Sequence, residues 1–255
     1  MGDGGGQPVG TDIDALIGRM ELLLQTLDPG DARRHFHSTY TRTTRAVADE
    51  LRTSALGGFA DPEWVERWDV AFAELYLEPF LSWQQSGRAP GPWTTVFRTA
   101  KDSPELPSVR HVLFGINVHV NFDLSRALLA VITDEEFDDP ALRARRQIDH
   151  VHIDKVLAGR VAAEEKEITD KSFVDRLLAP LNRRATARFL KEAREKVWRN
   201  AAAMSQARRQ GPEALQTRIK ELEGLCEARV NDLVAPGQVI LKLARRGFGV
   251  LLSGA

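Results

Sequence analysis

Two histidine–aspartate pairs with the same spacing are the residues of this sequence best suited to chemistry. Asp123 follows His119, and Asp154 follows His150, each four positions later. Residues four apart on a helix are neighbours on one face, so each pair presents an imidazole beside a carboxylate. These groups ligate divalent zinc, iron and manganese, and the interiors of helical bundles hold such centres. The spacing therefore predicts a divalent metal ion (zinc, iron or manganese) bound by His119, Asp123, His150 and Asp154.

Two hypotheses need no metal. Histidine titrates near neutral pH and a neighbouring carboxylate adjusts its basicity, so His119 and Asp123 could transfer protons, with His111 at the edge of the same cavity. Alternatively, each aspartate only satisfies the histidine one turn away, as part of a buried hydrogen-bond network. The sequence leaves both alternatives open beside the metal centre.

A second pair competes for the inward face of the later helix. Asp149 and His152 are three residues apart and lie on a different face from His150 and Asp154. Apolar residues surround the whole segment, so periodicity does not choose between the two pairs. We favour His150 and Asp154 because they repeat the spacing of His119 and Asp123.

The segment from Arg110 to Ile132 must position the first pair. It has no proline, and its apolar residues point all round the helical axis, which is typical of a helix enclosed by others. Polar side chains are costly to bury without partners, and this segment nevertheless carries several of them. A functional site beside this central helix is the resulting prediction. The polar residues are His111, Asn117, His119, Asn121 and Asp123.

The other polar residues of the central helix have structural roles in this interpretation. Asn117 and Asn121 point away from His119 and are expected to bind neighbouring helices or loop backbone. Gly115, one turn before His119, leaves space or permits a close helix contact. Tyr40 is a further candidate to reach the cavity from the helix over about 31–56.

Two segments outside the central helix are expected to border the site. Trp64, Trp68 and Phe72 form a stripe at helical spacing, which is either a core face or an aromatic cavity wall. Residues 87–107 are rich in proline, glycine and serine, and predict a long loop, with one turn around 94–100, that could cover the site. In contrast, His35 and His37 cannot share a helix face, and we expect them at the surface.

Nearly every segment has helical periodicity, and no alternating strand pattern is present. The fold class is therefore all-α: a single-domain helical bundle around the buried central helix, about 110–132. Residues 1–11 form a flexible N-terminal tail, and residues 12–255 form the helical domain. Pro79 should kink or divide the helix that contains it. Helices are expected at about 12–27, 31–56, 62–86, 110–132, 139–168, 172–181, 185–210, 212–234 and 237–246.

Composition excludes several classes of protein. Among 255 residues, 35 Lys and Arg balance 36 Asp and Glu, which argues against a nucleic-acid binder. The single cysteine, Cys226, excludes an internal disulfide and has the spacing of a buried apolar residue. No secretory signal and no membrane-length apolar run occur. We expect a cytoplasmic protein with a small-molecule substrate, and nothing in the sequence predicts its oligomeric state.

The run from His111 to Leu124 resembles the signature of a family of uncharacterised, mostly actinobacterial helical proteins. These proteins carry a Gly-x-Asn-x-His-x-Asn-x-Asp-Leu motif, which here corresponds to Gly115, Asn117, His119, Asn121, Asp123 and Leu124. The resemblance implies an all-α fold and no settled activity; a role in specialised metabolism would fit it.

Three functions follow from these patterns. The first is a small-molecule enzyme with a metal-assisted hydrolytic or lyase-type site. The second is a metal-free cyclase or isomerase that uses His119 and Asp123 as acid and base. The third is a non-catalytic helical binding or scaffold protein whose polar core specifies its packing.

Overall fold

The fold is all-α, as predicted, and no strand occurs in the part of the chain described here. The computed structural model describes residues 9–167, 180–235, 237 and 247–255, without the side chains of 158–167 and 180–191. The helices expected over 172–181 and 237–246 fall almost entirely outside these residues. The elements are α1 Thr11–Gln25, α2 Arg33–Thr53, α3 Pro62–Ser86, α4 Trp93–Asp102, α5 Ser108–Val118, η1 His119–Asp123, α6 Leu124–Val131, α7 Asp134–Asp138, α8 Pro140–Glu167, α10 Pro180–Gln210 and α11 Pro212–Val234.

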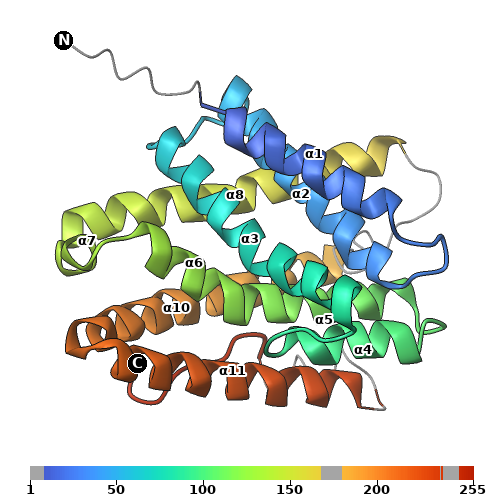
Figure 1. The fold of residues 1–255 in the computed structure, drawn as a ribbon. Coiled ribbons are helices and arrows are strands. Elements are labelled where there is room, and N and C mark those ends of the chain that lie inside the picture. Colours follow the sequence, from blue (N-terminus) through green and yellow to red (C-terminus); the bar gives the residue numbers. More distant parts are fainter. Residues whose placement is uncertain (1–8, 168–179, 236, 238–246) are drawn as a thin grey trace, which may run out of the picture.

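The predicted central helix lies in the middle of the bundle. Its consecutive parts α5, η1 and α6 run between α1, α2, α3 and α8 on one side and α10 and α11 on the other (Figure 1). Helices from both layers pack directly against it: α2 and α11 contact α5, and α3 and α10 contact α6. The side chains of Phe114, Val118 and Leu128 are 0% exposed. This enclosure is what the all-round apolar pattern predicts.

A single π-helical turn, η1, interrupts the central helix at the predicted site. The Leu124 N–H bonds to the His119 carbonyl five residues back, instead of to the one four back. The hydrogen-bond geometry of such a turn is poorer than that of a regular α-helix. π-Helical turns occur mostly as single turns within α-helices, frequently at functional sites. Here the turn begins at His119 and ends at Asp123.

The stretch 87–107 is not the long loop that the sequence predicts, because it contains the ten-residue helix α4. Its two glycines and two of its prolines precede Trp93, and its other two prolines, Pro104 and Pro107, follow the end of α4. Between these two groups, Trp93, Val96, Phe97 and Ala100 have helical spacing, and all four are buried. Tertiary burial of this short apolar face thus outweighs the loop-like composition of the flanks.

Pro79 does not divide α3, which runs unbroken from Pro62 to Ser86. A proline inside a helix removes one backbone donor, and a helix of 25 residues has many other bonds to hold it. The prediction for Cys226 is confirmed, since this residue is 0% exposed in α11.

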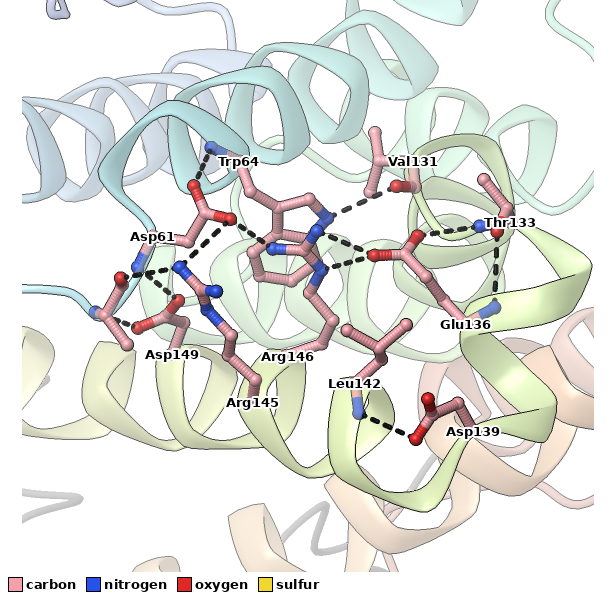
Figure 2. Close-up of polar contacts among 11 residues, drawn as sticks. Asp61, Trp64, Val131, Thr133, Glu136, Asp139, Leu142, Arg145, Arg146 and Asp149 are labelled. Carbon is pink, nitrogen blue, oxygen red and sulfur yellow. Dashed lines mark hydrogen bonds and ion pairs between the residues drawn. The ribbon is translucent and has the colours of Figure 1, made fainter.

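A polar network fixes the start of α8 to the other layers (Figure 2). The Arg146 guanidinium lies 2.6 Å from the carboxylate of Asp61 and 2.7 Å from that of Glu136, and stacks on the ring of Trp64. Asp149 accepts two backbone N–H groups just before α3, at 2.6 and 3.0 Å. These contacts hold α8 against the N-terminus of α3 and against α7.

Arg146→Met should destabilise the fold by about 3 kcal/mol, because it leaves two partly buried carboxylates without their shared cation. The matched control is Arg145→Ala, whose side chain is 54% exposed and lies 3.8 Å from Asp61. Its loss should cost no more than about 0.5 kcal/mol. Urea unfolding at pH 7 measures both values, and equal costs for the two variants would contradict this role of Arg146.

None of the helices in the described ranges combines the length and the apolar character that a bilayer span requires.

Candidate functional site

His119 and Asp123 form a buried hydrogen-bonded pair, as their spacing predicts. Nδ1 of His119 lies 2.9 Å from Oδ2 of Asp123, and the two residues are 4% and 0% exposed. The same oxygen accepts the indole N–H of Trp93 at 2.9 Å. Trp93 belongs to α4, so the segment expected to cover the site does contribute a side chain to it.

These contacts define the hydrogen-bonding capacity of the histidine. The indole N–H of Trp93 can only donate, and it occupies one lone pair of the Asp123 carboxylate oxygen. With the Nδ1 proton of His119 donated to the same oxygen, the free Nε2 atom carries a lone pair. The opposite end of the imidazole is therefore an acceptor, and Asp123 sets both the orientation and the tautomer of the ring.

Aromatic rings surround His119. Phe72 stacks on the imidazole with ring centroids 3.6 Å apart and planes 7° apart. Tyr40, expected to reach the site from α2, lies edge-on with a centroid distance of 4.4 Å. Such a wall excludes water and lowers the local dielectric, which strengthens electrostatic interactions inside it. The remaining rings of this shell are Phe36, Tyr76 and Trp93, at 5.9, 6.0 and 6.1 Å.

Several polar atoms at this site are buried without any hydrogen-bond partner in the described structure. They are Nε2 of His119, Oδ1 of Asp123, the hydroxyl of Tyr40 and Oδ2 of Asp69. Two of them have a polar neighbour: Arg126 forms an ion pair with Oδ1 of Asp123 at 3.7 Å, and the Thr44 side chain interacts with the Tyr40 hydroxyl. Buried polar atoms are nearly always paired, so a group of unpaired ones marks a place where water or ligand atoms bind. The negative charges of Asp69 and Asp123 both act on the Tyr40 hydroxyl, which places these groups near one another.

Burial controls the protonation of this group. It raises the pKa of Asp69 from 3.8 to about 7, and raises the pKa of Tyr40 well above 10. It lowers the pKa of His119, although the hydrogen bond to Asp123 opposes this. The pKa of the Asp123 carboxyl is raised by the same burial. At neutral pH the site therefore holds a neutral imidazole, a phenolic O–H and a carboxyl group at Asp69 that is close to half-protonated.

Asp69 is the site residue that sequence reasoning missed. Trp64, Trp68 and Phe72 predict an aromatic face on α3, and Asp69 lies three residues before Phe72, on the same side of that helix. A lone carboxylate on an apolar helix face is a detectable signal. Periodicity alone does not single out Asp69, because α3 also carries several exposed or half-buried acids.

The second predicted pair lies elsewhere. Nδ1 of His150 accepts the indole N–H of Trp198 at 3.1 Å, and burial lowers the pKa of His150 to about 3. The side chain of Asp154 is 38% exposed and forms an ion pair with Arg194. No three His, Cys, Asp or Glu side chains among the described residues are arranged to hold a metal ion. The structure therefore does not bring His119, Asp123, His150 and Asp154 together as one ligand set.

The competing pair on α8 is buried and has structural contacts. Asp149 caps the start of α3, as described above, and Nε2 of His152 lies 2.9 Å from the Glu50 carboxylate. Glu50 also accepts the backbone N–H of Gly58 at 2.8 Å. Both residues thus hold α8 to the connection between α2 and α3.

His111 is not among the rings and polar atoms that surround His119. It lines a separate cavity of about 10 Å³, where its Nε2 atom and Nη1 of Arg33 are both buried and unpaired. Phe36 and Tyr76 line this cavity as well, and their rings also lie beside His119. The volume fits about one water molecule, which could bridge the two unpaired atoms.

His37 is buried, in contrast to the surface position expected for it. Its Nε2 donates to the Met20 carbonyl at 2.7 Å, and its Nδ1 accepts from the Tyr76 hydroxyl at 2.8 Å. Two hydrogen bonds offset the cost of burying the ring, which is why this position tolerates a histidine.

The two asparagines of the central helix bind the C-terminal segment, which confirms their expected role. Asn121 donates to the Phe248 carbonyl at 3.0 Å and accepts the Val250 N–H at 3.1 Å. Asn117 donates to the same Phe248 carbonyl at 3.4 Å. These contacts fasten residues 248–250 against η1.

The chain belongs to a family of unknown function, DUF5995, whose model matches residues 13–236. The match covers most of the helical domain, including α5, η1 and α6. The resemblance to a helical family without a settled activity is thereby confirmed. No curated protein and no solved structure is significantly similar to the chain.

Gly115 allows α2 to pack closely against α5. A Cβ atom at this position would lie 2.3 Å from the Phe36 ring, closer than real Cβ contacts. Gly115→Ala should therefore destabilise the protein by about 1–3 kcal/mol in chemical unfolding, and Phe36→Leu in the same chain should recover part of that loss. The control Gly224→Ala, on the exposed side of α11, should stabilise by up to about 1 kcal/mol. A Gly115→Ala protein as stable as the parent would contradict the close contact.

Asp69 should make stability fall as the pH rises. In the folded protein the Asp69 carboxyl has a pKa of about 7, against an ordinary value of 3.8 for an aspartate. The stabilisation that the protonated Asp69 carboxyl contributes is therefore fully present below about pH 4 and is lost as the pH rises to about 7. Asp69→Asn removes this loss. The free energy of unfolding of the variant, relative to that of the parent, should therefore rise by up to about 4 kcal/mol between pH 4 and pH 8. Unfolding free energies of both proteins across this range test it, and parallel curves would show that Asp69 is not held protonated.

Proposed function

We propose that this protein is a small-molecule enzyme that transfers protons at a metal-free site, as cyclases and isomerases do. The observation that carries the proposal is the group of buried, unpaired atoms at His119, Asp123, Tyr40 and Asp69. A purely structural network would satisfy these atoms from within the protein. Leaving them free is useful where a substrate supplies the missing partners.

Each residue has a role that follows from its protonation. His119 accepts a proton at Nε2, while Asp123 holds the ring and stabilises the imidazolium that forms. Tyr40 keeps its proton, because its pKa is raised well above 10, and donates a hydrogen bond to a substrate oxygen. Asp69, with a pKa of about 7, can deliver or remove a second proton. A base and an acid at one site allow a proton to leave one substrate atom while another is protonated.

The metal-assisted hydrolytic or lyase-type reaction stays a prediction of the sequence. Its ligand set would need His150 and Asp154 beside His119, whereas His150 bonds to Trp198 and Asp154 to Arg194. The arrangement of donors thus supports the metal-free hypothesis better. A cytoplasmic location, which rests on sequence features, and a role in specialised metabolism, which rests on the resemblance alone, are part of the proposal.

Proton transfer can be tested before the natural substrate is known. The protein is incubated in D₂O with a panel of cyclic and open-chain ketones and enones, and exchange of carbon-bound hydrogen is followed by NMR. The parent should accelerate exchange for a subset of them, and His119→Gln should reduce this rate by about 10²–10⁴. A limb near pH 7 in the pH–rate profile should disappear in Asp69→Asn.

The control is His35→Gln, a change on the partly exposed side of α2. This variant should accelerate hydrogen exchange of the added compounds as much as the parent does. Metal analysis of the protein purified without a tag accompanies the assay. Full exchange activity in His119→Gln would refute the role of the imidazole. No exchange with any compound, together with stoichiometric metal that His119→Ala removes, would replace the proposal with the metal-assisted reaction.

A further inference from the structure

The aromatic shell around His119 has one member that differs from the others. Phe36, Tyr40, Tyr76 and Trp93 are all buried, with exposures between 0% and 6%, whereas Phe72 is partly exposed. Phe72 is also the ring in closest contact with the imidazole, at 3.6 Å and nearly parallel. A partly exposed side chain can change rotamer without disturbing the packed core, so this is the ring whose movement uncovers His119 at the least cost.

The space that Phe72 fills is bounded by groups that suit a ligand. One face is the imidazole of His119, and the ring of Tyr40 lies at 6.0 Å and 72° to Phe72. Asp69 projects from the same side of α3, three residues before Phe72. The phenyl ring supplies no hydrogen bond to the unpaired atoms of Tyr40, Asp69 and His119. The phenyl ring fills this space but leaves the surrounding polar atoms without hydrogen bonds.

We propose that Phe72 occupies the place of a planar six-membered ring of the substrate, one that carries a hydroxyl or carbonyl oxygen at its edge. This inference rests on the proposed function and names its substrate class. The ring of the substrate stacks on His119, and its edge oxygen meets the Tyr40 hydroxyl and the Asp69 carboxyl. An open-chain substrate would leave the stacking surface of His119 unused.

The test removes the phenyl ring and offers a replacement. Phe72→Ala opens a hole beside His119, and phenol is titrated into it with toluene as the nearly isosteric ligand without a hydroxyl. Binding is measured by calorimetry and by the NMR signals of labelled His119. Phenol should bind about tenfold more tightly than toluene, because only phenol pairs with the buried polar atoms. Adding Tyr40→Phe should reduce that preference at least threefold.

A matched control comes from the same helix. Trp83 is also a partly exposed aromatic residue of α3, packed on Phe97 at 5.8 Å, away from the unpaired group. Trp83→Ala should bind phenol and toluene equally or not at all. Should Phe72→Ala fail to fold, Phe72→Leu keeps part of the apolar contact, and phenol should still be preferred over toluene.

The possible outcomes separate this inference from the proposed function. Equal binding of phenol and toluene by the Phe72 variant, no binding of either, or phenol binding that leaves the His119 signals unmoved would overturn the substrate class. The proton-transfer proposal would then still be judged by the isotope exchange. Conversely, ring binding with the expected preference, alongside exchange that survives His119→Gln, would support a ring-binding site and refute the catalytic role.

Discussion

The hydrogen bond between His119 and Asp123 is the constraint on which the rest of the structure depends. An imidazole and a carboxylate are each costly to bury, and the central helix buries both. The four-residue spacing supplies the first partner, and Trp93 of α4 supplies the second. The bundle closes over the pair on all sides: α2 and α3 contribute the aromatic shell, while α10 and α11 cover the opposite face. Without the His119 bond, the buried Asp123 carboxylate would keep only the Trp93 hydrogen bond and the Arg126 ion pair at 3.7 Å.

The central helix has two polar faces, and they are satisfied in different ways. Both amide atoms of Asn121 are used by the C-terminal segment, which explains its burial in structural terms. On the opposite side, Nε2 of His119 and Oδ1 of Asp123 have no hydrogen bond in the described structure, although Arg126 lies 3.7 Å from that oxygen as an ion pair. On the Asn121 face, one buried atom, Oδ1 of Asn117, also lacks a hydrogen bond. The His119 face differs because its unpaired atoms gather with those of Tyr40 and Asp69, and this grouping favours a binding site there.

Local sequence patterns predicted the central helix and the His119–Asp123 bond, since both depend on helical spacing, and placed Asn121 on the opposite face without identifying residues 248–250 as its partners. The patterns failed where partners come from distant segments. His150 repeats the spacing of His119, but whether its imidazole meets the first pair depends on how α8 packs, and Trp198 of α10 takes that role instead. Asp69 and Trp93 are ordinary residues on their own helices and gain meaning only from tertiary contacts.

A substrate could reach the buried His119 only after one of the surrounding aromatic side chains moves. The free energy that this movement costs depends on which side chain moves. Moving Phe36 or Tyr76 would also disturb the cavity beside His111 and the contact between α2 and α5. Moving Phe72 disturbs a stacking contact at the surface of α3 and leaves the His119–Asp123 bond in place. In the proposed ring-binding site, the fixed part thus lies on the central helix and the part that moves is one side chain. That division would suit the proposed catalysis, since His119 would keep its orientation at each opening.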